Sequence, residues 1–150
     1  MLSQKAKYAL KAMIALAIQD EGNLLQAADI AERQNVPRKF LELILLDLRK
    51  HGLVRSQRGK LGGYALAKPA DTITFGQIIR IMDGPIAPIP CASLTGYRRC
   101  ADCRDEKACA VRRTMREVRD AAAAILDGTT LADAIGAGAR GRDLRSAIGI

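Results

Sequence analysis

The chain has 150 residues and a formal net charge of +8 at pH 7, with a pI of about 9.7. This length fits one domain with an extension. The positive charge favours a polyanionic partner, although charge alone predicts association and not fold. Aromatic residues make up only 3% of the chain, so aliphatic side chains must build the core. Because no apolar stretch is long enough to span a membrane and the first residues do not form a secretory signal, we expect a cytoplasmic protein.

Three helices are predicted in the N-terminal part, each with apolar residues at helical spacing. Ser3 can cap the first helix, the second covers about 26–34, and Pro37 precedes the third, which ends at Gly52. Asn35 can adopt the left-handed conformation of a tight turn. Two short helices joined in this way form a helix-turn-helix pattern.

A β-hairpin should follow these helices. Residues 53–57 and 64–67 are predicted strands, with a turn that contains three glycines between them. An isolated hairpin is marginal in water, so this one should pack on the helices, as the wing of a winged helix-turn-helix does. Thr74 and Gln77 then have the spacing of a capping box and open a helix that ends near Gly84.

One long amphipathic helix is predicted from about Lys107 to Asp127. Its apolar residues recur with the alternating four- and three-residue spacing of a coiled-coil seam, and its arginines, Arg119 among them, lie outside that seam. The seam consists of Val111, Met115, Val118, Ala122 and Ile125. So small a domain cannot cover this seam alone, so we expect a homodimer through residues 110–126. The alternative is a helix folded back on its own domain.

The expected fold is mainly α with a small β-hairpin, in which a winged helix-turn-helix domain is joined to a long C-terminal dimerisation helix. The winged domain should cover 1–84, and a cysteine-rich sensor loop should cover 85–109. The dimerisation helix and a short following helix should cover 110–135, and 136–150 should be a disordered tail because it is rich in Gly, Ala and Arg.

All four cysteines lie in the loop, as Cys91-x8-Cys100-x2-Cys103-x5-Cys109. In a reducing compartment clustered cysteines indicate metal or redox chemistry before structural disulfides. Thiolates suit iron–sulfur clusters and zinc, and the arginines and lysines nearby should lower the pKa of the thiols. An iron–sulfur cluster, a zinc site and bare thiols that form a disulfide on oxidation all remain open, with zinc and bare thiols ranked after the cluster.

An enzyme is not expected, because the chain lacks a Walker-type phosphate loop, a G-x-S-x-G motif and an H-E-x-x-H motif. The alternative is a thiol redox protein that uses Cys100 and Cys103, but a C-x-x-C without a surrounding βαβ pattern is a weak signal. A regulator controlled by a partner protein, with structural cysteines, is a further alternative.

Residues 1–135 resemble the IscR/NsrR group of bacterial transcription regulators (the Rrf-two family). The matching motifs are KAKYALKAMIALA, DIAERQNVPRKFLELILLDLRKHGLV, RGKLGGYALAKPADTITFGQII and GTTLADAI. The resemblance implies a homodimer that binds double-stranded, pseudo-palindromic operator DNA. In several similar proteins three cysteines of the loop before the dimerisation helix hold an iron–sulfur cluster.

A recognition helix places its N-terminal residues against base edges in the major groove. The candidate DNA-binding residues are Arg38, Lys39, Phe40 and Glu42 on the helix and Arg58 and Lys60 on the wing. Glu42 can accept from cytosine, and Phe40 either contacts DNA or packs in the core. In similar proteins an arginine that matches Arg58 enters the minor groove. General phosphate candidates are Lys5, Lys7, Arg49 and Arg55.

The resemblance makes Cys91, Cys103 and Cys109 the first three metal ligands, with Cys100 as the fourth or a spare. Some similar proteins take the fourth ligand from a histidine where this chain has Arg112, and others from an acidic residue on the first helix, which this chain lacks. The cluster type, 2Fe–2S or 4Fe–4S, is open. Gain or loss of the cluster, in response to iron, redox state or nitric oxide, should change the order of the loop and the spacing of two recognition helices.

Overall fold

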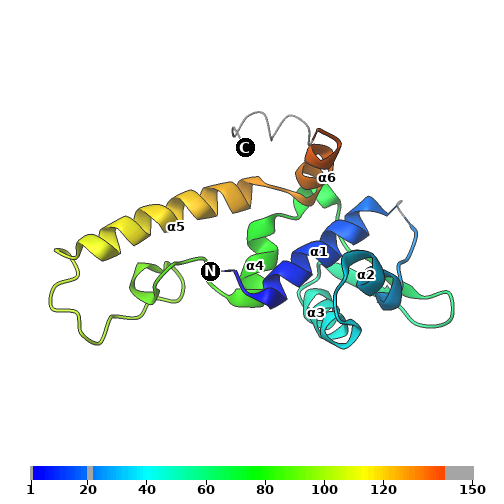
Figure 1. Ribbon diagram of the computed structural model, residues 1–150, viewed down its shortest axis with the longest axis horizontal. Helices are drawn as coiled ribbons and strands as arrows, with labels where there is room; N and C mark the ends of the chain where they lie inside the picture. Colours follow the sequence, from blue (N-terminus) through cyan, green and yellow to red (C-terminus); the bar gives the residue numbers. More distant parts are fainter. Residues whose placement is uncertain (1, 20–21, 141–150) are drawn as a thin grey trace.

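The computed structural model describes residues 2–19 and 22–140. A helical body carries the hairpin at one end, and the long helix α5 extends away from it (Figure 1). The loop between α4 and α5 returns along α5 and joins its far end. The elements are α1 (Gln4–Ile18), α2 (Ala27–Gln34), α3 (Arg38–Lys50), β1 (Val54–Gln57), β2 (Gly63–Leu66), η1 (Ala70–Thr72), α4 (Phe75–Asp83), η2 (Pro90–Ala92), α5 (Ala110–Gly128) and α6 (Leu131–Arg140).

The predicted helix ends are confirmed in the N-terminal body. The Ser3 side chain accepts a hydrogen bond from the backbone N–H of Ala6 and caps α1. Asn35 adopts the left-handed conformation, with φ of 51°, between α2 and α3. Thr74 and Gln77 form both hydrogen bonds of a capping box at the start of α4. These local signals fix where α1 and α4 begin and where α2 ends.

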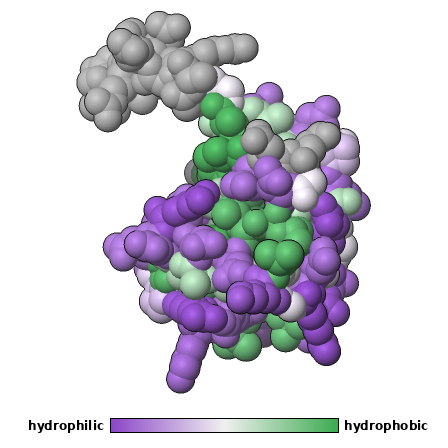
Figure 2. All heavy atoms as spheres, turned by 90° about the vertical axis from the view of Figure 1, so that its right-hand side faces the viewer, coloured by the Kyte–Doolittle hydropathy of each residue, from purple (hydrophilic) through white to green (hydrophobic). Residues whose placement is uncertain are grey.

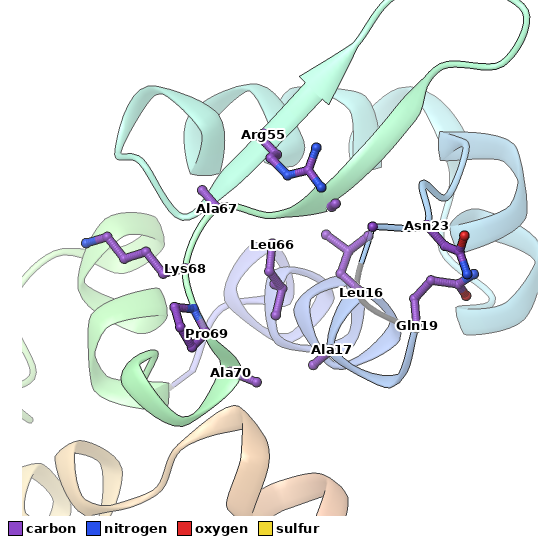
Figure 3. A pocket seen from close by; sticks show the side chains of 12 residues that line it. Leu16, Ala17, Gln19, Asn23, Arg55, Leu66, Ala67, Lys68, Pro69 and Ala70 are labelled. Atoms are coloured by element: carbon purple, nitrogen blue, oxygen red, sulfur yellow. The ribbon is translucent and has the colours of Figure 1, made fainter.

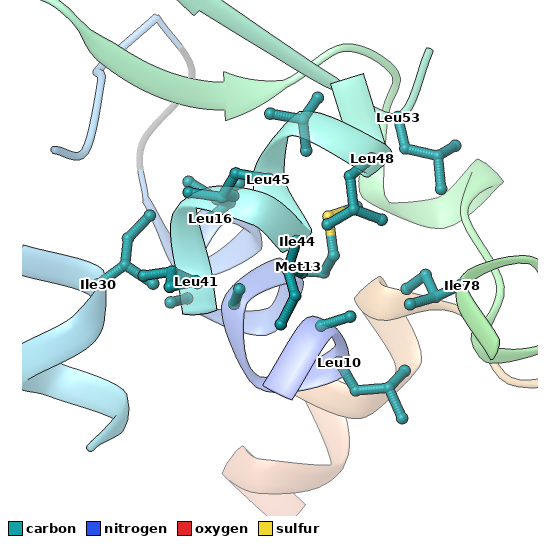
Figure 4. Packing of buried hydrophobic residues seen from close by; sticks show 14 of the residues in the cluster. Leu10, Met13, Leu16, Ile30, Leu41, Ile44, Leu45, Leu48, Leu53 and Ile78 are labelled. Carbon is teal, nitrogen blue, oxygen red and sulfur yellow. The ribbon is translucent and has the colours of Figure 1, made fainter. Parts of the chain in front are cut away.

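An aliphatic core lies between α1 and α3 (Figure 4). Met13 from α1 and Leu45 from α3 are fully buried in it, as are Ile30 and Ile78 from the helices on either side. Leu131 of α6 is also fully buried, and its backbone N–H donates to the carbonyl of Ile73 at 2.9 Å. The chain after α5 therefore returns to the body and completes its core.

The hairpin is fixed to the body through its second strand. β1 and β2 are antiparallel, and Tyr64 exchanges two backbone hydrogen bonds with Leu25, at 2.7 and 2.9 Å. Gly63 permits this approach: its φ is +150°, and a Cβ there would lie 2.6 Å from the Leu25 carbonyl oxygen. The wing therefore has a defined position beside α2.

The long helix begins at Ala110 and not at Lys107 as predicted. In the preceding turn the Asp105 carboxylate accepts from the Lys107 N–H at 2.9 Å, and the Cys109 sulfur accepts from the Arg112 N–H at 3.4 Å. These side chains satisfy backbone donors, which favours a turn there and a helix start after Cys109.

At its other end α5 is held to α4. Arg80 and Asp127 form a bidentate ion pair, with oxygen–nitrogen distances of 2.6 and 2.9 Å, which lowers the pKa of Asp127 and raises that of Arg80 through their hydrogen bonds. The Asp127 carboxylate lies over Gly76, where a Cβ would be 1.9 Å from its Oδ1 atom. Glycine therefore allows α5 to approach α4 at this point.

The predicted seam of α5 is open to solvent in the single chain. Val111, Val118 and Ile125 are 62%, 46% and 68% exposed, so this helix does not fold back to bury them. α6 continues to Arg140, beyond the predicted end, and the rest of the expected tail, 141–150, lies outside the described residues. None of the described helices combines the length and the apolarity that a membrane span requires.

Candidate functional site

A concave surface lies between α3 and the hairpin. The cavity has a volume of about 610 Å³, and four of the predicted DNA-binding residues line it: Arg38, Glu42, Arg58 and Lys60. Arg49, a general phosphate candidate, lines it too. The fold therefore brings the start of the recognition helix and the tip of the wing to one surface.

The charged groups of this surface are accessible. Arg38 and Glu42 form an ion pair at 3.1 Å, with side chains 65% and 46% exposed, and such exposed pairs contribute less than about 1 kcal/mol. Both groups can therefore exchange this contact for one with DNA. Arg58 and Lys60 are exposed and have no ion pair within the described residues. Gln26 donates to the carbonyl of Lys60 at 3.2 Å and holds the wing tip near α2.

Two predicted residues lie elsewhere on α3. Phe40 is half-buried against the core, and its ring meets that of Tyr8 edge-on, with 5.6 Å between the ring centroids. Of the two roles expected for Phe40, DNA contact or core packing, this arrangement corresponds to core packing. Lys39 is exposed but does not line the concave surface. Lys5 is engaged with Asp47 at 2.8 Å, and this hydrogen bond lowers the pKa of the Asp47 carboxyl.

A separate hollow lies between the end of α1 and β2. On one face of the molecule, hydrophobic residues are exposed between hydrophilic ones (Figure 2). The volume of the hollow is about 340 Å³, and Leu16 and Leu66 contribute to its lining. The Arg55 side chain extends over it and Lys68 points away (Figure 3). Of the predicted DNA-binding residues only Arg55, a general phosphate candidate, lines this hollow, and none of the four cysteines does.

All four cysteines line a second open cavity of about 500 Å³ between the loop and the first turn of α5. Cys91 is buried in η2, Cys103 and Cys109 are half-buried, and Cys100 is exposed. The fold therefore brings all four cysteines to the edge of one cavity.

The electrostatics of Cys100 differ from the prediction. The pKa of its thiol is raised, first by a hydrogen bond with Cys91 and then by the charge of Cys91. The expectation that neighbouring basic residues lower the pKa is therefore wrong for Cys100. The two sulfurs share an adjoining cavity with Arg98 and Arg99, but the contact between the thiols dominates because it is direct.

The donor set fits a soft metal or an iron–sulfur cluster in its chemistry. No group of three or more metal-ligating side chains converges within the described residues, which include all four cysteines. The thiols thus share a cavity but are not pre-assembled into a coordination site. A metal or cluster would require the loop to close around it.

Two arginines of α5 hold the turn that carries Cys91. Arg112 Nε donates to the Cys91 carbonyl at 2.9 Å, and the buried Arg119 donates to the carbonyl of Ala92. Arg119 also pairs with Asp120 at 2.6 Å. We call these two arginines the arginine clamp. Sequence reasoning placed Arg119 only outside the seam, because its partner is a backbone carbonyl 27 residues away.

Comparisons with known proteins bear on the concave surface beside α3 and on the cysteine cavity. A family model described as Rrf2, an iron-dependent transcriptional regulator, matches residues 2–137. The chain belongs to the Rrf2 family. A protein of Rhodobacter capsulatus, an HTH-type transcriptional regulator whose name includes "rrf2-like", is 45% identical over 141 residues, which is 92% of this chain and 94% of that protein.

Other Rrf2 relatives carry different names. IscR of Escherichia coli is 33% identical over 134 residues, 89% of this chain and 79% of that protein. The structure of CymR, called the global cysteine regulator of B. subtilis, matches with a TM-score of 0.74 and 37% identity over 89% of this chain and 94% of that one. The structure of T. potens IscR matches with a TM-score of 0.73 and 30% identity over 92% and 88%.

These matches confirm the mainly helical fold with a two-stranded hairpin and identify the chain as an HTH-type transcriptional regulator of the Rrf2 family. The relatives are named as regulators and not as enzymes. The printed descriptions point to different signals. CymR is called a cysteine regulator, whereas the family model is described as iron-dependent.

Proposed function

We propose that this Rrf2 protein is a cytoplasmic, homodimeric regulator that binds operator DNA through α3 and the wing and senses its signal through an iron–sulfur cluster on the loop. The observation that carries the proposal is that all four cysteines line one cavity at the start of α5. The same chain thus joins a concave surface that carries basic residues to a cysteine cavity through a helix whose seam is exposed.

The DNA-binding part rests on the residues between α3 and the wing. Arg38 and Glu42 lie at the start of α3, from which a recognition helix contacts base edges, and Arg58 lies at the wing tip. Arg58→Ala should weaken specific binding. Unchanged affinity for the best operator in a gel-shift titration would refute this assignment of the wing.

The dimer rests on the seam of α5. Three large aliphatic side chains, Val111, Val118 and Ile125, are each about half exposed or more and recur at coiled-coil spacing. A second copy of the same helix covers such a seam most simply. Two-fold symmetry then implies a pseudo-palindromic operator with half-sites about one helical turn apart.

Cys91, Cys103 and Cys109 would hold the cluster, with Cys100 as the candidate fourth ligand. An iron–sulfur cluster, when bound, supplies a group that changes oxidation state and is lost on reaction with oxidants or nitric oxide. Tyr8 stands where some similar proteins have an acidic ligand on the first helix, and its ring packs against Phe40. Arg112 stands where others have a histidine ligand, but its cationic guanidinium offers no lone pair and donates to the Cys91 carbonyl.

The arginine clamp provides the coupling. Arg112 and Arg119 lie seven residues apart, on the flank of α5 next to the seam, and both hold consecutive carbonyls of η2. A movement of the turn that carries Cys91 therefore acts on the helix that would pair the two subunits. DNA affinity can change only by the difference in stability between the two arrangements.

Anaerobic purification followed by iron, acid-labile sulfide and zinc analysis, with a visible absorption spectrum, tests the cofactor. The proposal predicts a coloured protein with matched iron and sulfide. Colourless protein with stoichiometric zinc would make the loop a zinc site and contradict the cluster. Replacing each cysteine in turn by serine identifies the ligands, and iron content should fall for Cys91, Cys103 and Cys109.

A thiol switch is the second candidate function, because Cys91 and Cys100 line two cavities together. A peroxide would oxidise the exposed Cys100 thiol to a sulfenic acid and release water. The Cys91 sulfur would then attack that sulfur, which forms the disulfide and releases a second water. Metal-free protein that forms this disulfide with one equivalent of hydrogen peroxide, and loses operator binding with it, would favour this switch over the cluster.

A further inference from the structure

The outermost stripe of α3 contains two leucines between two lysines. The buried residues of α3 are Leu41, Ile44, Leu45 and Leu48. With 3.6 residues per turn, the side directly opposite them carries Lys39, Leu43, Leu46 and Lys50. Leu43 is 60% and Leu46 is 42% exposed. We call these four residues the outer stripe.

We propose that Leu43 and Leu46 read the 5-methyl groups of thymine in the major groove of the operator. This inference rests on the proposed function, because it takes α3 as the recognition helix. A helix in the major groove turns its core-distal side to the base edges. In this chain that side is the outer stripe, so the leucines face the bases while Arg38 and Glu42 lie on the flank towards the wing.

The chemistry of the base edges selects thymine. In the major groove adenine, guanine and cytosine present hydrogen-bond donors and acceptors, and thymine alone adds a methyl group. A leucine against a polar edge displaces water and returns no hydrogen bond, which is unfavourable. A leucine against a thymine methyl removes apolar surface of both groups from water, which is favourable. The two leucines therefore favour thymine and also disfavour the other bases at the positions they meet.

The charges around the stripe favour DNA over a protein as its occupant. Lys39 and Lys50 lie at its two ends, and Arg49 is exposed beside it. The acidic residues of α3 are both engaged, Glu42 by Arg38 at 3.1 Å and Asp47 by Lys5 at 2.8 Å. An apolar pair framed by free cations complements a groove that is edged by phosphates.

Single methyl groups can be deleted from the DNA to test the proposal. An operator is first selected from a random library with the wild-type protein, and each thymine is then replaced singly by deoxyuridine, which lacks the 5-methyl group. Binding is measured by fluorescence anisotropy for wild type, Leu43→Ala and Leu46→Ala. Ile18→Ala is the control, because Ile18 is 63% exposed and lies at the end of α1, outside the concave surface and the cysteine loop. Thermal unfolding of each variant checks that these exposed substitutions leave the fold intact.

For the wild type, one or two thymines in each half-site should lose about 3- to 10-fold in affinity when their methyl is removed, as expected for a buried methyl group. Leu43→Ala or Leu46→Ala should lower affinity by a similar factor and should then be insensitive to methyl removal at one of those positions. Ile18→Ala should keep the wild-type pattern.

Three results would overturn the inference. In the first, the wild type binds its selected operator specifically but tolerates every loss of a methyl, so the proposed function stands and the reading of thymine does not. In the second, both alanine variants keep the full wild-type penalty. In the third, they bind as the wild type does but change the oligomeric mass, which makes the stripe a protein-docking surface. Failure to select any operator would refute the proposed function itself.

Discussion

Replacing Arg119 by methionine tests the arginine clamp. Methionine keeps much of the apolar stem and removes the donors. The carbonyl of Ala92, a residue that is 1% exposed, would lose its partner, and a buried acceptor left unpaired costs about 1–3 kcal/mol. The lost pair with Asp120 adds little, because that carboxylate is 63% exposed. We expect a loss of about 2 kcal/mol in the free energy of unfolding, which lowers Tm by roughly 4–8 °C at this chain length.

The measurement is thermal unfolding at one protein concentration, because association also shifts Tm. The control is Arg116→Met, since Arg116 is exposed on the same helix and has no ion pair within the described residues. A second readout is the alkylation rate of Cys91, mapped by mass spectrometry. Cys91 is 5% exposed, and release of its turn should accelerate its labelling. Equal stability and equal labelling of the two variants would refute the clamp.

Three other substitutions, and Gly136→Ala as a control, test the interface and the junction of α5 with α4. Lys60→Ala should weaken binding to all DNA sequences similarly and reduce the salt slope of log K by about 1. Asp127→Asn should cost less than about 1 kcal/mol at pH 7. Arg80 lowers the pKa of Asp127 in the folded protein. The stability that this ion pair adds is therefore complete above the unfolded pKa of about 3.9 and is lost as pH falls through the lower folded pKa. A difference in unfolding free energy between wild type and Asp127→Asn that grows towards pH 3 would contradict this. Gly76→Ala should destabilise the protein, because the Cβ would meet Asp127, whereas Gly136→Ala meets nothing within 4 Å and should be neutral or stabilising by up to about 1 kcal/mol.

The parts of the fold that depend on neighbours in sequence could be predicted. Asn35 and the Thr74–Gln77 capping box act through hydrogen bonds or backbone angles a few residues away, so residue type and spacing suffice. The docking of Leu131 beside Ile73 could not be found in this way. It depends on where the end of α5 lies relative to α1 and α4, and long-range packing decides that position.

The candidate site divides in the same manner. The spacing of the cysteines indicated one sensor loop, and the structure does place the four thiols on one cavity. The raised pKa of Cys100 could not be predicted, because charge counting along the sequence omits its direct contact with Cys91. The outer stripe was missed for another reason: leucine is the residue type of a core position, and the helical period separates Leu43 from Leu45 only once the buried face of α3 is known.

The central claim is that occupancy of the cysteine loop controls operator binding, and one titration tests it most directly. Anaerobically purified protein is divided, one half is treated with a chelator and an oxidant followed by thiol reduction, and both halves are titrated with the selected operator at one salt concentration. The untreated half should contain iron and sulfide. The two halves should differ in operator affinity by about 5- to 150-fold, the usual range of allosteric coupling. Equal affinity of the loaded and stripped protein for the same operator would contradict it.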